Sequence, residues 1–400
     1  MLLDDDAGVI APESCAYTEV TAMQRPSAID ATMIFGEKLM MTLRLMGNRT
    51  GGLIGCICAT GGACSRKGYG VVMTAATRTP AHLYLASLPA VTAMNYRHAY
   101  HAGNFADVLK HTVLLALIEA MQAKSTPFCY VDTHAGSGSY VLDGFEARKT
   151  GEHKDGIARL HPAEKVPPLL QRWRASILGG EGNEQGLKHY PGSPLQVARL
   201  LRPDDSAQLS ELHTEEASKL RDLFRGHPQV HVHQRDGYEA LKALLPPKEK
   251  RGLVLIDPPY EAQDAEYKLI EKALKEALQR WPTGVYAVWY PIKLRSQVQP
   301  FLRGLQRSEA KRVLRVELLV HPDDSPLRLN GAGMVILNAP WNFDDVLREP
   351  LRALASLLSQ DRPAEWKLDW LRQEGAEPAA PSPLPPSRLL RPGTPPPRRR

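Results

Sequence analysis

The sequence lacks the features that mark membrane and exported proteins. It has no run of eighteen apolar residues, which is the length that a membrane-spanning helix requires. Its first residues, Met-Leu-Leu-Asp-Asp-Asp, carry acids where a secretory signal carries bases, so export is not expected. Only five cysteines occur in 400 residues, too few and too unevenly placed for a disulfide framework. These absences predict a reduced, cytoplasmic protein with no membrane partner.

The sequence also lacks a strong charge of one sign in its central part. The net charge is +6, but residues 376–400 hold five arginines and one acid, and residues 1–93 hold seven bases and seven acids. Residues 94–375 therefore carry a net charge of only about +2. Bulk charge alone does not establish binding to nucleic acid, so any such function must be argued from local residues.

Acidic residues are missing from one long stretch near the start. Between Lys38 and Ala106 there is no Asp or Glu. The Gly-, Ala- and Thr-rich piece from Thr50 to Gly70 follows neither a helical nor a strand period. We therefore expect residues 1–93 to be an N-terminal extension that is disordered, or that lies upstream of a true start at Met94.

The rest of the chain divides by composition. Residues 376–400 are rich in Pro and Arg and low in complexity, so we expect a disordered tail. Residues 94–375 are expected to form one folded domain. Cys56, Cys58 and Cys64 do not have the spacing of a zinc ribbon, and no metal site is predicted.

One stretch, Gly252–Tyr260, organises the domain. Leu253–Ile256 is a short, continuous apolar run, typical of a strand that is buried on both faces of a parallel sheet. Pro258 and Pro259 have no N–H to donate, so the strand must stop at Asp257. Its end then carries a carboxylate, free carbonyl groups and a tyrosine ring, which we expect to be exposed. In open α/β sheets ligands bind at this end of the strands.

Similar apolar runs alternate with helical patterns along the domain. They predict an α/β fold with a seven-stranded, mostly parallel sheet that has helices on both faces. Residues 144–190 interrupt the alternation with charged and Gly-rich stretches, which predicts a small helical insertion. The last two strands are expected to form a hairpin. The predicted strands are Phe128–Val131, Ala207–Glu211, a run from Val230, Leu253–Ile256, Val285–Trp289, Val313–Val320 and Met334–Leu337.

Acidic residues follow three of these strands. Asp132, Glu211 and Asp236 each stand at a strand end, and in a parallel sheet such ends share one edge. Each acid alone is more often a turn or capping residue, but the ordered set suits successive parts of one extended ligand. An acid at the second strand end can accept both hydroxyls of a ribose.

The turn after the first strand narrows the choice of ligand. Asp132 stands four residues before Gly136, which begins a Gly-Ser-Gly turn. Such a turn lets a backbone approach a ligand closely. The dinucleotide fingerprint fails because Val141 stands where its third glycine belongs. An acid at this place suits a ligand that carries an ammonium group, such as S-adenosylmethionine.

Two helix starts lie in the same domain. Asn104 is predicted to be the N-cap of a helix that runs to about Lys124. Lys110 and His111, two adjacent polar residues in this helix, indicate a solvated edge. Ser193, followed by proline, is predicted to be the N-cap of another helix, whose free amides could also hold part of a ligand.

Taken in order, these segments resemble a known family. Asp257-Pro-Pro-Tyr260 is similar to the motif of amino-methyltransferases that act on adenine N6. Over residues 94 to about 345 the chain resembles the RlmJ family of bacterial 23S ribosomal RNA (adenine-N6)-methyltransferases. The segments that carry the resemblance are Tyr96-Arg-His98, His101-Ala-Gly-Asn104, Ala106–His111, Asp132–Gly136, Tyr190–Pro194 and Asp257–Tyr260.

The resemblance implies a Rossmann-like class I methyltransferase fold. It also implies S-adenosylmethionine as the cofactor, 23S ribosomal RNA as the partner and a role in ribosome biogenesis. By resemblance, Asp257, Pro258 and Tyr260 are catalytic and Tyr96 lies near the RNA. The cofactor contacts that it implies are His111, His134, Ser193, Glu211, Asp236 and Gly237.

The implied reaction suits these residue types. Adenine N6 is a poor nucleophile because its lone pair is delocalised into the ring. Asp257 and the carbonyl group of Pro258 can each accept a hydrogen bond from one of its two N–H groups, which favours a pyramidal nitrogen. Asp257 would then take or relay the proton. Tyr260 would stack on a base that is flipped out or single-stranded. The aromatic and basic arm Tyr96–His101 suits single-stranded RNA, although it could also be an ordinary surface strand.

Two other functions fit part of this pattern. A DNA adenine-N6 methyltransferase would share Asp257-Pro-Pro-Tyr260, but it needs a region that reads base edges, and residues 144–190 look too short for that. A non-enzymatic rRNA-binding assembly factor could keep the fold. It would not need Asp257, Glu211 and Asp236 together, which favours an enzyme.

Overall fold

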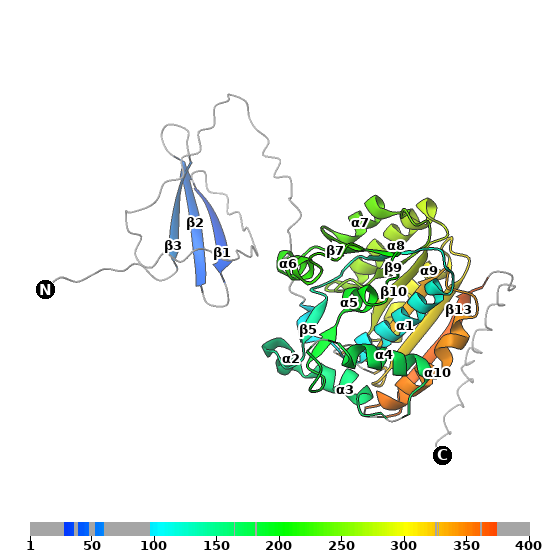
Figure 1. The fold of residues 1–400 in the computed structure, drawn as a ribbon. Coiled ribbons are helices and arrows are strands. Elements are labelled where there is room, and N and C mark those ends of the chain that lie inside the picture. Colours follow the sequence, from blue (N-terminus) through cyan, green and yellow to red (C-terminus); the bar gives the residue numbers. More distant parts are fainter. Residues whose placement is uncertain are drawn as a thin grey trace, which may run out of the picture. The chain divides into compact units, whose positions relative to one another are not determined.

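The computed structural model describes residues 28–35, 39–47, 53–59 and 97–373, except 164, 181, 325, 327 and 361. The chain divides into two compact units, Met1–Val91 and Thr92–Arg400. The first unit contains a three-stranded antiparallel sheet in the order β1-β2-β3 (Figure 1). Within Thr50–Gly70, where the sequence shows no strand period, the structure contains β3, because strand pairing need not appear as a local period. The strands are β1 Ala28–Phe35, β2 Leu39–Gly47 and β3 Leu53–Ala59.

The second unit is built on a sheet in the order β13-β11-β12-β10-β9-β4-β7-β8. The five strands from β8 to β10 are parallel, and β12, β11 and β13 pair antiparallel beyond them. All seven predicted strands are present, and the predicted hairpin is β11 with β12. The bounds are β4 Cys129–Asp132, β7 Ser206–Glu211, β8 Val230–Gln234, β9 Gly252–Ile256, β10 Val285–Ile292, β11 Val313–Leu319, β12 Gly331–Leu337 and β13 Glu365–Arg372.

The prediction of seven strands is wrong by one, because β13 is an eighth. Its sequence alternates, with Trp366, Leu368 and Trp370 partly buried against the core, so its period of two was a usable signal. A bidentate ion pair fixes it to the sheet, since Arg315 Nε and Nη2 lie 2.8 and 2.7 Å from the Asp369 carboxylate oxygens.

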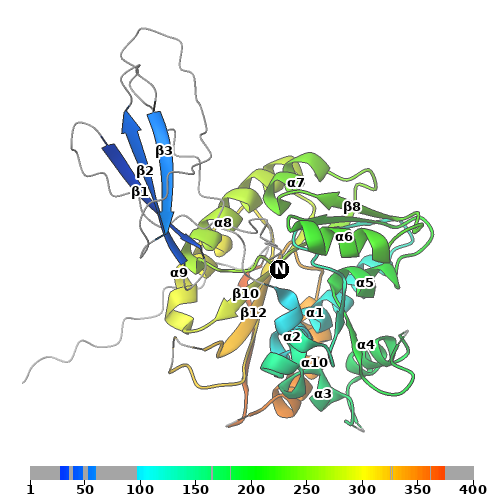
Figure 2. The same cartoon turned by 90° about the vertical axis from the view of Figure 1, so that its left-hand side faces the viewer.

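Helices cover both faces of this sheet (Figures 1 and 2). Side chains of α1, α4, α5, α6 and α10 belong to one buried apolar cluster, and those of α7, α8 and α9 belong to another. None of the described helices is long and apolar enough to cross a membrane. The bounds are α1 Phe105–Gln122, α4 Pro168–Leu178, α5 Ser193–Ala198, α6 Thr214–Leu223, α7 Gly237–Leu244, α8 Gln263–Arg280, α9 Arg295–Gln306 and α10 Phe343–Leu357.

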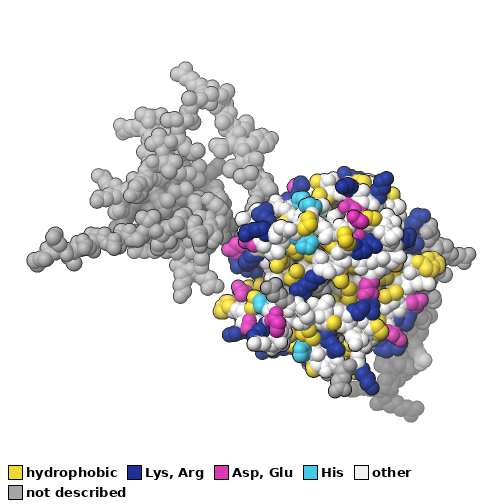
Figure 3. All heavy atoms as spheres, in the orientation of Figure 1, with side chains coloured by type: hydrophobic (Ala, Val, Ile, Leu, Met, Phe, Trp, Pro, Cys, Tyr) yellow, Lys and Arg dark blue, Asp and Glu magenta, His cyan; other side chains and the backbone are white. Residues whose placement is uncertain are grey.

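The predicted helical insertion is present between the two strands of a small hairpin. β5 Ser139–Val141 pairs antiparallel with β6 His189–Pro191. Between them lie α2 Phe145–Thr150, the 3-10 turn η3 Glu152–Asp155, α3 Ile157–Leu160 and α4. On the face seen in Figure 3, basic and acidic side chains are interspersed.

Candidate active site

Four acidic residues gather at one edge of the sheet, as predicted. Asp132 ends β4 and Glu211 ends β7. Asp257 directly follows β9, and Asp236 stands two residues after the end of β8. Because β9, β4, β7 and β8 are consecutive parallel strands, these four residues follow one another along the carboxyl edge. This is the edge at which α/β sheets bind ligands.

The first cavity at this edge is lined by His134, Ser193, Glu211 and Asp257, among others. Its space, part of which is open to solvent, has a volume of about 710 Å³. Glu211 is held by two backbone amides, with Gly136 N 2.8 Å from Oε2 and His213 N 2.7 Å from Oε1. Burial nevertheless raises the pKa of Glu211 above its ordinary value.

The turn beside Glu211 requires glycine. Gly136 has a φ of 62°, a left-handed conformation that side chains disfavour. A Cβ on this residue would lie 2.2 Å from the Tyr140 hydroxyl oxygen. The backbone at Gly136 can therefore approach a ligand in the first cavity more closely than any other residue type would allow.

Asp132 lies behind the wall of this cavity and is fully buried. It accepts hydrogen bonds from the hydroxyls of Ser193 and Tyr130, each at 2.7 Å, and from His134 N at 3.2 Å. Burial raises its pKa from 3.8 to about 6. The residue that caps α5 is Gly192, so the prediction that Ser193 is the N-cap is wrong: its hydroxyl donates to Asp132 instead.

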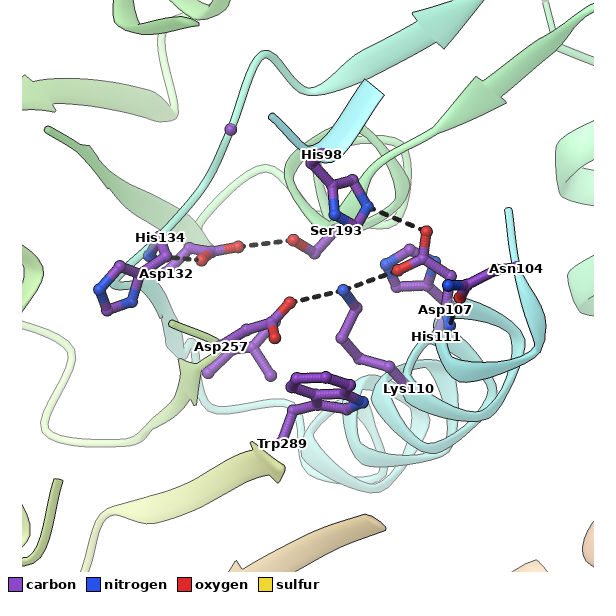
Figure 4. Close-up of polar contacts among 12 residues, drawn as sticks. His98, Asn104, Asp107, Lys110, His111, Asp132, His134, Ser193, Asp257 and Trp289 are labelled. Carbon is purple, nitrogen blue, oxygen red and sulfur yellow. Dashed lines mark hydrogen bonds and ion pairs between the residues drawn. The ribbon is translucent and has the colours of Figure 1, made fainter. Parts of the chain in front are cut away.

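Lys110 joins the first turns of α1 to the end of β9. Its Nζ lies 2.8 Å from Asp107 Oδ1 and 2.5 Å from Asp257 Oδ2 (Figure 4). The interpretation of Lys110 and His111 as a solvated edge is wrong, because they are only 4% and 1% exposed. Burial opposes the charged form, but the attraction of Asp107 and Asp257 outweighs it and raises the pKa of Lys110.

Asp107 also ties the arm that precedes α1 to the helix. Its Oδ2 accepts a hydrogen bond from Gly103 N at 2.9 Å and lies 2.9 Å from His98 Nε2. Asn104 caps α1 as predicted, with its Oδ1 2.9 Å from Asp107 N. Burial raises the pKa of Asp107, but the charges of His98 and Lys110 outweigh burial and hold this pKa well below its ordinary value.

A second cavity adjoins the first at Asp257. It is bounded by the arm, by Glu152 of the insertion and by the end of β10. His98, Lys110, Asp257, Pro258 and Pro259 line both cavities. The Asp257-Pro-Pro segment therefore forms the boundary at which ligands in the two cavities would meet.

Tyr260 does not have the exposed ring that the sequence led us to expect. It is 8% exposed, and its hydroxyl donates a hydrogen bond to the carbonyl oxygen of Trp289. Its ring packs edge-on against Tyr267 and Trp289, with centroids 5.6 and 5.5 Å away. It borders the second cavity, but only as a fixed part of the wall, because the apolar face of α8 captures the ring.

Three residues assigned to the cofactor are not among those that line either cavity. His111 is buried in α1 with Nδ1 2.6 Å from the Tyr190 hydroxyl oxygen, and burial lowers its pKa to about 3. Asp236 caps α7 by accepting from Tyr238 N and Glu239 N, and a Cβ on Gly237 would lie 2.1 Å from the carbonyl oxygen of Thr133. Tyr96 lies outside the described residues.

Other residues at the second cavity were not predicted. Glu152 accepts from Asn104 Nδ2 at 2.9 Å and lies 2.9 Å from His101 Nδ1, which connects the insertion to the arm. Trp289 comes from β10 and Lys293 from just beyond it. Both stand near the carboxyl end of a predicted strand, and that position is the sequence feature that could have identified them as site residues.

Comparison with known proteins identifies the family. The model of the family described as "Ribosomal RNA large subunit methyltransferase D, RlmJ" matches residues 125–372. "Ribosomal RNA large subunit methyltransferase J" of Haemophilus influenzae is 41% identical over 281 residues, and its Escherichia coli namesake is 39% identical; each match covers 70% of this chain and all of the relative. A crystal structure of a Legionella pneumophila protein matches with a TM-score of 0.61 and 36% identity, over 67% of this chain and 98% of that one. The chain therefore belongs to the RlmJ family of ribosomal RNA large subunit methyltransferases.

Proposed function

We propose that this large-subunit ribosomal RNA methyltransferase transfers a methyl group from S-adenosylmethionine to the N6 amine of an adenine in 23S rRNA, in the cytoplasm, during ribosome biogenesis. The observation that carries the proposal is that Asp257 and Pro258 line both cavities. A donor in the first cavity and a base in the second would meet at the carboxylate that the reaction needs.

The first cavity fits this cofactor. When bound, S-adenosylmethionine supplies an electrophilic methyl group. Glu211, fixed by two backbone amides, offers its remaining lone pairs to the ribose hydroxyls. Gly136 lets the backbone come close to the ligand, and Ser193 and His134 complete the wall. Asp132 orients both of these through its hydrogen bonds, so we assign it a positioning role.

The residues behind the cavity wall support it without lining it. Asp236 holds the start of α7, and Gly237 lets that helix pack closely on the end of β4. His111 is buried in α1, where its Nδ1 lies 2.6 Å from the Tyr190 hydroxyl oxygen. We keep all three as cofactor-site residues, with indirect roles, and Tyr96 as the RNA contact that the family resemblance implies.

Asp257 and Pro258 bind the amine of the target base. Lys110 pairs with Asp257 Oδ2. We therefore assign Asp257 Oδ1 and the carbonyl oxygen of Pro258 as the acceptors of hydrogen bonds from the two N6–H groups. These two hydrogen bonds localise the lone pair on nitrogen, and holding the amine in line lowers the entropic part of the barrier. Asp257 then accepts or relays the proton that the methylated amine releases. The adenine must be flipped out or single-stranded to reach this depth.

The test is transfer of labelled methyl groups to a protein-free 23S rRNA fragment, with mapping of N6-methyladenine. We expect transfer to RNA, none to duplex DNA, and none from Asp257→Ala, whose affinity for S-adenosylmethionine should stay within about three-fold of wild type. Asp264→Ala, which removes an exposed acid in the first turn of α8, is the matched control and should be fully active. Undiminished transfer by Asp257→Ala would overturn the assigned role.

A further inference from the structure

The second cavity contains one aromatic ring from the sheet that is neither fully buried nor held by a hydrogen bond. Trp289 lies near the carboxyl end of β10, is partly exposed and lines this cavity. Figure 4 shows its indole beneath Lys110 and Asp257. The indole therefore shares this cavity with the carboxylate to which we assign the adenine amine.

Tyr260, the other ring contributed by the sheet edge, is only 8% exposed and so offers little free surface to a base. Its hydroxyl bonds the main chain of Trp289, and its ring meets Tyr267 and Trp289 at interplanar angles of 65° and 63°. The fixed tyrosine instead supports the backbone from which the indole of Trp289 projects.

The indole N–H indicates that Trp289 is not explained by packing alone. Its Nε1 is buried and has no hydrogen-bond partner among the described residues. A buried tryptophan usually finds a partner for this donor, because an unpaired buried donor is costly. Phenylalanine would fill the same side of the strand without that cost. The property that tryptophan has and phenylalanine lacks is the larger aromatic face, which therefore explains a tryptophan at this position.

We propose that Trp289 is the platform on which the target adenine stacks while Asp257 and Pro258 hold its amine. This inference rests on the proposed function. The platform would bind the π-face that all bases share, so selectivity for adenine would come from the two acceptors above it. The role that the sequence motif suggests for Tyr260 then passes to a residue on the neighbouring strand.

The test compares Trp289→Leu and Trp289→Phe with the wild-type full-length chain on the same rRNA fragment. We expect Trp289→Leu to raise KM for RNA about ten-fold or more, and Trp289→Phe about three-fold, because stacking strength follows ring area. Affinity for S-adenosylmethionine should stay within two-fold. The melting temperature of Trp289→Phe should equal or exceed that of wild type, because the unpaired donor is gone. Trp281→Phe, at a buried position at the C-cap of α8, is the matched control and should leave KM unchanged.

A binding measurement decides the proposal even if Trp289→Leu does not fold. Stacking should change the tryptophan emission of the wild-type protein on RNA binding, and Trp289→Phe should lose most of that change. A wild-type KM in a folded Trp289→Leu, or an undiminished emission change in Trp289→Phe, would overturn the proposal. Failure of the proposed function would look different, since the wild-type protein itself would then methylate no adenine.

Discussion

Lys110 Nζ lies 2.5 Å from Asp257 Oδ2 and 2.8 Å from Asp107 Oδ1, at a depth where the lysine side chain is 5% exposed. One ammonium group thus separates two carboxylates that would otherwise repel each other. The same contact fixes the rotamer of Asp257 and leaves its second oxygen for the substrate. The same lysine therefore both balances the charge of Asp107 in α1 and sets the geometry of the acceptor site at Asp257.

Lys110→Met should damage both stability and activity. Removing one member of a buried, charged network typically costs about 3–5 kcal/mol, because the remaining charges lose their partner. We expect the free energy of unfolding, measured by urea denaturation, to fall by about that amount. Single-turnover methyl transfer should fall much further than the unfolded fraction explains, because Asp257 is no longer oriented.

The matched control is Lys149→Met. Lys149 is an exposed lysine whose Nζ lies 5.7 Å from the centre of the Tyr100 ring. Its loss should change the free energy of unfolding by less than about 1 kcal/mol and leave single-turnover transfer intact. If Lys110→Met were as stable and as active as Lys149→Met, the ion pair would have no role.

Glu211→Gln should weaken cofactor binding. The carboxylate accepts one backbone N–H on each oxygen, and a glutamine side chain has only one acceptor oxygen. One of the amides of Gly136 and His213 would then face an NH₂ group. We expect the affinity for S-adenosylmethionine to fall about ten-fold or more by calorimetry, since hydrogen bonds to a charged group are worth about 1.5–3 kcal/mol.

Glu216→Gln is the control for that experiment. Glu216 lines the same cavity from α6, and its carboxylate makes an ion pair with Lys219, at 2.9 Å, so it adds negative charge to the cavity without organising its backbone. Its affinity for the cofactor should stay within about three-fold of wild type. Equal losses in the two variants would indicate that the cavity needs negative charge rather than the fixed geometry of Glu211.

Local patterns were sufficient to predict the sheet edge but not the environment of its side chains. Seven strands of the large sheet, the cap at Asn104 and the order of the acids follow from short-range periodicity and turn residues. Lys110 was misjudged because its partner Asp257 is 147 residues away, and no local pattern contains that ion pair. Tyr260 was misjudged for a related reason: its ring is captured by Tyr267 and Trp289, which come from two other elements.

A chain that begins at Met94 should retain full methyl transfer. The matched relatives align over 281 residues, which is 70% of this chain and all of each relative. Every residue that lines the two cavities also falls between 97 and 329. We therefore propose that residues 94–375 are the methyltransferase domain and that residues 1–93 and 376–400 are dispensable. Reduced RNA binding or a lower melting temperature in the shortened chain would show that residues 1–93 contribute.

Asp132 should make stability depend on pH between about 4 and 6. Its pKa is 3.8 when unfolded and about 6 in the fold, so in this window the folded chain binds the extra proton. Stability from this group therefore falls as pH rises through the window, by up to about 3 kcal/mol. Asp107, whose folded pKa is lowered, acts oppositely, since its contribution is present above pH 4 and is lost only in stronger acid.

The difference between wild type and Asp132→Asn isolates the Asp132 contribution from that of Asp107. An amide does not titrate, so the variant should be the less stable chain at pH 4, where the protonated acid suits its buried site. Its free energy of unfolding should increase relative to that of wild type as the pH rises to 7, where the wild-type carboxylate is ionised without a cation beside it. Urea denaturation at pH 4, 5, 6 and 7 measures this directly. A stability difference that stays constant across that range would mean that Asp132 is already ionised at pH 4, and that its three hydrogen bonds outweigh its burial.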